Sequence, residues 1–147
     1  MSIKNLVKKE DIVFSDDIKN KEEAIYFLAN HLYKKGKIKE IDDFIKEVYR
    51  REEMGPTGFG KGIAIPHAKS NVVKETSLTI LKLENPIKWE SLDDENVKII
   101  FLISVPEDNA SIEHLKILAN VSRKLVDEDF INKLMKSSTS EEILNIL

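Results

Sequence analysis

Apolar side chains recur at helical spacing in the first third of the chain. Within residues 21–35 they stand three and four positions apart: Ala24, Ile25, Leu28 and Leu32. Gly36, a residue type that commonly ends helices, follows this stretch. Residues 40–53 repeat the same spacing with a second apolar set. We therefore predict two amphipathic helices, over residues 21–35 and 40–53.

Strand-like patterns occupy the middle of the chain. Residues 77–83 alternate loosely between apolar and polar side chains. Residues 97–105, VKIIFLISV, form a nearly continuous apolar run, which is typical of a central strand covered on both faces. Shorter runs are compatible with an edge strand at residues 11–14 and a brief strand at residues 63–65.

Turns and further helices complete the pattern. Asn85-Pro86 and the acidic residues 93–96 are predicted to be turns. After Pro106 the apolar spacing is helical again in three segments: residues 111–126, 129–136 and 140–147. Because helices precede, interrupt and follow the strands, we expect an α/β fold. It would form a single domain over residues 1–147, with a mixed parallel and antiparallel β-sheet sandwiched by α-helices.

Composition narrows the possible functions. The chain has 147 residues, with 23 Lys and Arg against 26 Asp and Glu, so its net charge of −3 argues against non-specific nucleic-acid binding. It has no cysteine, which excludes disulfides, thiolate nucleophiles and iron–sulfur clusters. No apolar run approaches the ~18 residues needed to span a bilayer. The first 13 residues lack a signal core, and we expect a cytoplasmic protein without direct membrane insertion.

One glycine-rich segment stands out. Four of the five glycines lie within residues 55–62. Clustered glycines let the backbone turn with positive φ and let amide groups converge on an anion. Residues 50–74 hold five basic and only two acidic side chains. We predict a phosphate-binding loop with Thr57 as a hydroxyl donor and Gly58 and Gly60 as backbone donors.

Two familiar nucleotide motifs do not fit this segment. A P-loop requires Lys-Ser or Lys-Thr after the last glycine, and the chain has neither there. The glycines of a dinucleotide-binding turn follow a strand and open a helix, whereas these precede a strand-like run and a proline.

His67 follows the glycine-rich segment directly. Pro66 fixes its own φ and favours an extended Ile65, so His67 is expected at a defined place where a short strand ends at the sheet's edge. Imidazole titrates near neutrality, and its unprotonated form is a nucleophile. Such a group beside an anion-binding loop suits phosphoryl transfer through a nitrogen–phosphorus bond. From these residues alone, a structural histidine beside a connector is equally compatible.

Two separated runs resemble the signatures of one family. Residues 51–67 read Arg-Glu-x-x-Gly-x-Thr-Gly-x-Gly-x-Gly-x-Ala-Ile-Pro-His, which resembles the active-site signature of enzyme IIA proteins of the fructose/mannitol family (EIIA type 2). These proteins belong to the bacterial phosphoenolpyruvate–sugar phosphotransferase system (PTS). Residues 113–125, EHLKILANVSRKL, resemble the second signature of this family, and residues 130–143 match its ending. Pro56 stands where the family often has serine, and this form resembles the galactitol-type branch.

The resemblance implies a phosphotransferase that serves as a phosphoryl carrier in sugar transport. His67 would receive the phosphoryl group from phospho-HPr, with His114 beside it and Arg51 as the cation for the phosphoryl oxygens. The group would pass to a cysteine of enzyme IIB on a separate chain, and IIB would connect it to the membrane enzyme IIC. The resemblance implies no organic cofactor, no metal and no nucleic-acid partner.

Other readings remain open at this stage. A nitrogen-regulatory-type IIA module would also be phosphorylated on His67 but would act by binding proteins according to its phosphorylation state. A small-ligand or zinc-binding domain would use His67 and His114 as ligands, although no other His, Asp or Glu stands at a supporting spacing. His31 and Trp89 are expected to be packing residues, and Lys69 is equally compatible with phosphate contact and with plain surface.

Overall fold

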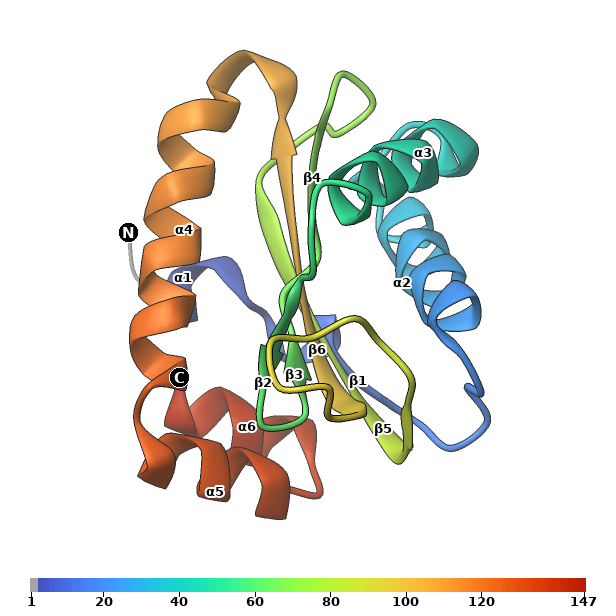
Figure 1. Ribbon diagram of the computed structural model, residues 1–147. Coiled ribbons are helices and arrows are strands. Elements are labelled where there is room, and N and C mark those ends of the chain that lie inside the picture. The colour runs from blue at the N-terminus through green and yellow to red at the C-terminus, as the bar shows by residue number, and fades with distance from the viewer. Residues whose placement is uncertain (1–2) are drawn as a thin grey trace.

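A computed structural model describes residues 3–147, apart from the side chains of residues 109–111 and 113. One mixed β-sheet lies between two layers of helices (Figure 1). The six strands of the described part are β1 Ile12–Ser15, β2 Gly58–Gly60, β3 Ile63–Ala64, β4 His67–Ser70, β5 Ser77–Ile87 and β6 Val97–Pro106. Its α-helices are α1 Ile3–Leu6, α2 Lys21–Lys34, α3 Ile41–Glu52, α4 Ala110–Leu125, α5 Glu128–Lys136 and α6 Ser140–Ile146. Short 3₁₀ turns at Lys9–Asp11 and Glu107–Asn109 precede β1 and α4.

The sheet has the order β1-β5-β6-β3-β2, and β4 also pairs with β6. Strand β5 runs antiparallel to β6, whereas β1 pairs parallel with β5 and both β3 and β4 pair parallel with β6. The predicted α/β class with a mixed sheet between helices is therefore confirmed. The short strand predicted at residues 11–14 is confirmed as an edge strand, β1.

Strand β6 shows why the sheet is covered on both faces. Ile100 and Leu102 belong to the apolar cluster shared with α2 and α3, whereas Ile99, Phe101 and Ile103 belong to the cluster shared with α1, α4, α5 and α6. Successive side chains of a strand point to opposite faces, so an uninterrupted apolar run is what two covered faces require. The predicted central strand is confirmed.

Helix α3 brings one charged side chain to the sheet. The Glu40 carboxylate caps its first turn by accepting from the backbone amides of Asp42 and Asp43. Phe44 and Val48 form its fully buried face. Because side chains three and four positions apart share a helix face, Arg51 continues this face in the last turn. The helix ends at Glu52, shortly before Gly55 and Pro56.

The region between α3 and β5 differs from the sequence prediction. The glycine-rich segment is not only a loop, because Gly58–Gly60 forms strand β2, which pairs antiparallel with β3. His67 does not end a strand but begins β4. The turn predicted at Asn85-Pro86 lies inside β5, where the pairing with β6 is irregular between Lys82 and Ile87. A proline without an N–H donor is tolerated where the ladder is already interrupted.

A buried lysine joins β5 to the end of α5. The Lys82 ammonium donates to the carbonyl oxygens of Leu134, Met135 and Ser137 at 3.0, 2.6 and 2.5 Å. These carbonyls lie at a helix C-terminus, which carries partial negative charge.

Replacing Lys82 by methionine should lower the free energy of unfolding by about 2 kcal/mol or more, since charged hydrogen bonds to buried carbonyls are lost. Denaturant titration of the wild-type and variant chains measures this change. Lys98→Met is the matched control, because Lys98 is a cation near Lys82. Burial is the largest cause that lowers the pKa of Lys82, and the charge of Lys98 lowers it further. An equal loss of stability in both variants would contradict the specific role of Lys82.

In residues 3–147 the structure contains no helix of the length and apolarity that a bilayer span requires.

Candidate active site

His67 lies where β4 begins, and backbone hydrogen bonds hold the two residues that precede it. The Pro66 carbonyl accepts from the amide of Ile103 in β6 at 3.0 Å, and the amide of Ile65 donates to the Thr57 carbonyl at 2.9 Å. Ile65 and Pro66 are thus anchored by the segment that precedes β2 and by β6. His67 is only 6% exposed and is therefore a buried residue.

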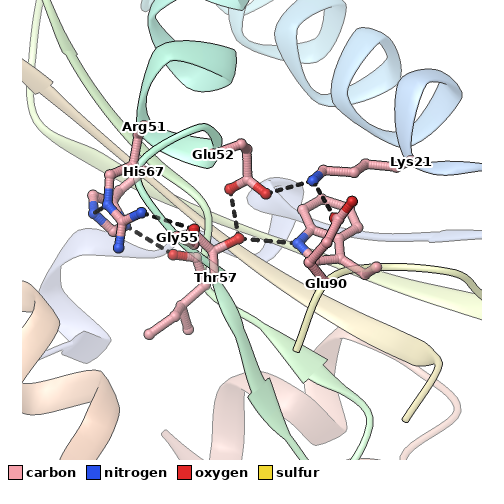
Figure 2. A network of polar contacts seen from close by, with 9 residues as sticks. Lys21, Arg51, Glu52, Gly55, Thr57, His67 and Glu90 are labelled. Carbon is pink, nitrogen blue, oxygen red and sulfur yellow. Dashed lines mark hydrogen bonds and ion pairs between the residues drawn. The ribbon is translucent and has the colours of Figure 1, made fainter. Parts of the chain in front are cut away.

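The hydrogen bonds of the two ring nitrogens of His67 show which nitrogen carries the proton (Figure 2). Nδ1 lies 2.9 Å from the Ile65 carbonyl oxygen, which can only accept, so Nδ1 carries the proton. Nε2 lies 2.8 Å from Nε of Arg51, which can only donate, so Nε2 presents its lone pair. The neutral ring is therefore held with Nε2 as its nucleophilic atom.

Arg51 is itself held by a second contact. Its Nη1 donates to the Gly55 carbonyl at 3.1 Å. Gly55 has a φ of 144°, a conformation that side-chain-bearing residues rarely adopt. The loop after α3 therefore turns its carbonyl back to the guanidinium, which fixes Arg51 beside His67.

His114 of α4 approaches His67 from the opposite helical layer. The two ring centroids lie 4.4 Å apart, with the ring planes tilted by 52°. The His114 Nε2 atom is buried and has no hydrogen-bond partner among the described residues. Burial, followed by the charges of His67, Lys69 and Arg51, lowers the pKa of His114 to about 4. His114 is thus neutral at physiological pH, with a nitrogen free for a further partner.

The pKa of His67 is also lowered from its ordinary value of 6.5. Burial is the largest cause, and the positive charge of Arg51 acts in the same direction, whereas the hydrogen bond to the Ile65 carbonyl opposes them. A lowered pKa keeps the imidazole unprotonated near neutral pH, which is the form that can attack an electrophile.

A cavity of about 250 Å³ opens beside the two histidines. Its walls combine three cationic side chains with one acid and two apolar residues: Arg50, Arg51, Lys69, Glu47, Met54 and Ala68, in addition to His67 and His114. Positive charge around a nucleophile suits an anionic group such as a phosphoryl. The structure therefore brings together His67, His114, Arg51 and Lys69.

The predicted loop residues lie outside this cavity. The Thr57 hydroxyl donates to Oε2 of Glu52 at 2.5 Å and accepts from Nε1 of Trp89 at 2.9 Å. The Gly58 amide donates to the Glu90 carbonyl at 2.9 Å. Gly60 packs near the Asp93 carboxylate. The Thr57 and Gly58 donors have partners elsewhere, and none of the three residues lines the cavity, so the structure does not assemble the phosphate-binding loop expected from the sequence.

Gly58 is required for a different reason. A Cβ atom at this position would lie 2.3 Å from Cβ of Ser91. The glycine allows β2 to pack directly against the segment that follows Trp89. Its place in the motif thus reflects close packing.

The metal-site alternative has little support in the geometry. In the part of the chain that the structure describes, no three His, Asp or Glu side chains gather as metal ligands. Both nitrogens of His67 are already in hydrogen bonds, and the Arg51 guanidinium beside them repels a cation. His31 lies elsewhere, with its Nε2 3.5 Å from the buried carboxylate of Asp11.

Several contributors to the site were missed from the sequence. The carbonyl oxygens of Ile65 and Gly55 hold the imidazole and the guanidinium, and backbone acceptors leave no residue-type signal. Glu52 is buried beside Arg51, and Lys21 of α2 pairs with it at 2.6 Å. The only available signal for Glu52 was its place in the Arg-Glu pair of the motif.

Comparison with known proteins identifies relatives over nearly the whole chain. The model of the family described as "Phosphoenolpyruvate-dependent sugar phosphotransferase system, EIIA 2" matches residues 5–147. The chain is 32% identical to the 2-O-alpha-mannosyl-D-glycerate-specific EIIABC component of Escherichia coli K12, over 100% of this chain and 22% of that protein. It is 30% identical to the fructose-specific EIIA component of Haloferax volcanii, over 99% of this chain and 94% of that protein. The chain thus spans about a fifth of the first relative and nearly all of the second.

Solved structures share the fold. Nitrogen regulatory protein IIA-Ntr from Neisseria meningitidis superposes with a TM-score of 0.89 at 28% identity, covering 98% of this chain and 97% of that one. The mannitol enzyme IIA in a complex with phosphorylated enzyme IIB from Escherichia coli gives a TM-score of 0.80, covering 95% of each chain. At 22% identity, this second likeness concerns the fold alone.

Proposed function

The chain belongs to the EIIA 2 family of the phosphoenolpyruvate-dependent sugar phosphotransferase system, and we propose that it carries a phosphoryl group on Nε2 of His67. The observation that carries this proposal is the orientation of the ring. The Ile65 carbonyl accepts a hydrogen bond from the protonated Nδ1, and Arg51 lies at Nε2. The nucleophilic nitrogen and a cation for the incoming group are therefore in one place.

The first transfer begins with phospho-HPr at the cavity. The nitrogen–phosphorus bond of the donor breaks as the bond from phosphorus to Nε2 of His67 forms. The Nδ1 proton stays on the ring, where the Ile65 carbonyl stabilises the positive charge that the ring gains. Arg51 exchanges its hydrogen bond to Nε2 for one to a phosphoryl oxygen.

His114 and Lys69 offer two further contacts to the phosphoryl group. The unpaired Nε2 of His114 is available to hydrogen-bond a phosphoryl oxygen. Lys69 lines the same cavity and adds a second cation. Thr57 and Gly58 make no direct contact with the group, because their donors have other partners, and Gly60 does not line the cavity.

The partners follow from the proposed carrier role. Phospho-HPr is the donor, and a cysteine of enzyme IIB is the acceptor, which links the carrier to the membrane enzyme IIC and to sugar uptake. Residues 1–147 act as one EIIA unit in the cytoplasm, where donor and acceptor meet. The cavity's cations suit a phosphorylated partner.

The regulatory module left open by the sequence is not favoured. Two of the sequence relatives, at 32% and 30% identity, are named as sugar-specific components. A regulatory output would also use His67 as the phosphorylated residue, so the transfer to a IIB cysteine is the step that separates the two functions.

The test of the proposal is a two-step transfer assay. The purified chain is incubated with phosphoenolpyruvate, enzyme I and HPr, and its intact mass is recorded under alkaline conditions. We expect an acid-labile gain of one phosphoryl group, followed by its loss when a IIB protein is added. No gain, while a known EIIA control is phosphorylated, would overturn the proposal; a gain with no transfer to any tested IIB would instead support the regulatory alternative.

The rate of phosphoryl acceptance should depend on pH in one direction. Nε2 must be unprotonated to attack, and burial together with Arg51 holds the pKa of His67 below its ordinary value of 6.5. The rate should therefore stay flat above pH 6.5 and fall only as the pH drops through the lowered pKa. Single-turnover rates with phospho-HPr measure this profile, and an NMR titration of His67 separates its ionisation from that of the donor. A decline that begins above pH 6.5 would contradict the assigned environment.

A further inference from the structure

A network of buried polar side chains adjoins Arg51 (Figure 2). Glu52 follows Arg51 in sequence, and its side chain is 5% exposed. Its two carboxylate oxygens have separate partners: Nζ of Lys21 at 2.6 Å and the Thr57 hydroxyl at 2.5 Å. An uncompensated buried carboxylate is costly, so this arrangement needs both partners.

The chemistry of the partners determines the direction of each hydrogen bond that Thr57 makes in this network. The Trp89 indole can only donate, and it donates to Oγ1 of Thr57 at 2.9 Å. The single hydroxyl proton of Thr57 is then directed to Glu52, because the carboxylate can only accept. Thr57 is buried, and its hydroxyl both donates and accepts within this network.

The bond between Glu52 and Thr57 closes a small loop. Gly55 lies inside this loop, and its carbonyl accepts from Nη1 of Arg51. The Gly55 amide in turn donates to the Glu52 carbonyl at 3.3 Å. The closed loop therefore fixes the acceptor that holds the guanidinium, whose Nε contacts His67.

Lys21 gives the arrangement its charge balance. Burial alone would lower the pKa of Lys21, but its hydrogen bonds to Glu52 and Glu90 raise it, so the amine remains a cation. Lys21 neutralises Glu52 from α2, on the side away from His67 (Figure 2). The Glu52 carboxylate is thus paired with Lys21 rather than with Arg51. The positive charge of Arg51 therefore remains available to an anion in the cavity.

We propose that Lys21, Glu52 and Thr57 form a positioning relay that closes the loop after α3 and holds Arg51 against Nε2 of His67. This inference deepens the proposed function and rests on it for the reaction concerned. The relay residues touch neither the phosphoryl group nor the imidazole. Thr57 has a defined part in catalysis through Arg51, in place of the direct phosphate contact expected from the sequence.

Thr57→Val tests the relay, because valine keeps the shape of threonine and removes the hydroxyl. We expect the rate of phosphorylation per folded molecule to fall about ten- to a hundredfold, since small displacements of a catalytic group have effects of that size. Thr57→Ser is the matched control, since it keeps the hydroxyl and should restore most of the rate. Glu52→Gln, which loses the charge that pairs with Lys21, should also lower the rate.

Two readouts separate positioning from stability. The pKa of His67, followed by NMR without any phosphoryl donor, should rise in Thr57→Val, because the charge of Arg51 that helps to lower it is displaced. In an Arg51→Met background, Thr57→Val should cause no further loss of rate, because the relay acts through Arg51. A Thr57→Val chain with an unchanged His67 pKa and rate, or with a loss that adds fully to that of Arg51→Met, would overturn the relay. The NMR readout stands even if the wild-type chain accepts no phosphoryl group, so failure of the relay is distinguishable from failure of the proposed function.

Discussion

Replacing His67 by glutamine should abolish phosphoryl acceptance while leaving the fold intact. Glutamine has no ring nitrogen that can form a stable bond to phosphorus, so the nucleophile disappears completely. Its amide reaches the position of Nε2, and its oxygen can still accept from Nε of Arg51 in the buried position. We therefore expect the free energy of unfolding to change by no more than about 1–2 kcal/mol. Intact mass after incubation with phospho-HPr measures acceptance, and denaturant titration measures stability.

The other two histidines provide matched controls for this substitution. His31 lies near Asp11, and His31→Gln should be phosphorylated like the wild-type chain. His114→Gln removes the ring 4.4 Å from His67 but not the nucleophile, so it should still accept a phosphoryl group more slowly or hold it for a shorter time. If the His67→Gln chain gained a phosphoryl group, His114 would become the acceptor to test next. A collapse of stability in His67→Gln alone would identify His67 as a structural histidine.

Periodic patterns predicted the elements that carry most of the apolar core. Helical spacing placed α2 and α3 to within about one residue, and the continuous apolar run of β6 predicted a strand with two covered faces. Strand β2 was beyond this reasoning, because no period can be recognised over three residues, whereas the brief strand expected at residues 63–65 is present as β3. The pairing of β3 depends on β6, which follows much later in the chain.

The same limit separates the parts of the site that the sequence identified from those that it did not. Arg51 and His67 came from a contiguous motif, and they meet in the structure. The Thr57 hydroxyl was expected on a phosphate, but it meets Glu52 and the indole of Trp89, which is 32 residues away in sequence. A motif specifies which residue types occur together, whereas the partner of each polar atom depends on tertiary contacts between distant segments.

Replacing Arg51 by lysine should lower the rate of phosphoryl transfer about 10²- to 10³-fold, although the charge is kept. A guanidinium has a planar set of donors, and Arg51 uses it to contact Nε2 of His67 and the Gly55 carbonyl at once. A lysine ammonium is a single point on a flexible stem and cannot reproduce both contacts. Removal of one preorganised donor from a transition state costs about 3–4 kcal/mol, which corresponds to the expected loss. Single-turnover kinetics with phospho-HPr measure it.

Comparison with Arg51→Met divides the role of Arg51 into charge and geometry. In Arg51→Met the pKa of His67 should rise, since burial remains but the positive charge that also lowers it is gone. In Arg51→Lys the charge remains nearby, so the pKa should change less while the rate still falls. Arg50→Lys is the matched control, because the Arg50 side chain is 71% exposed and pairs with Glu47 at the surface. If Arg51→Lys retained the wild-type rate, positive charge alone would be sufficient, and the contacts to His67 and Gly55 would have no part in the transfer.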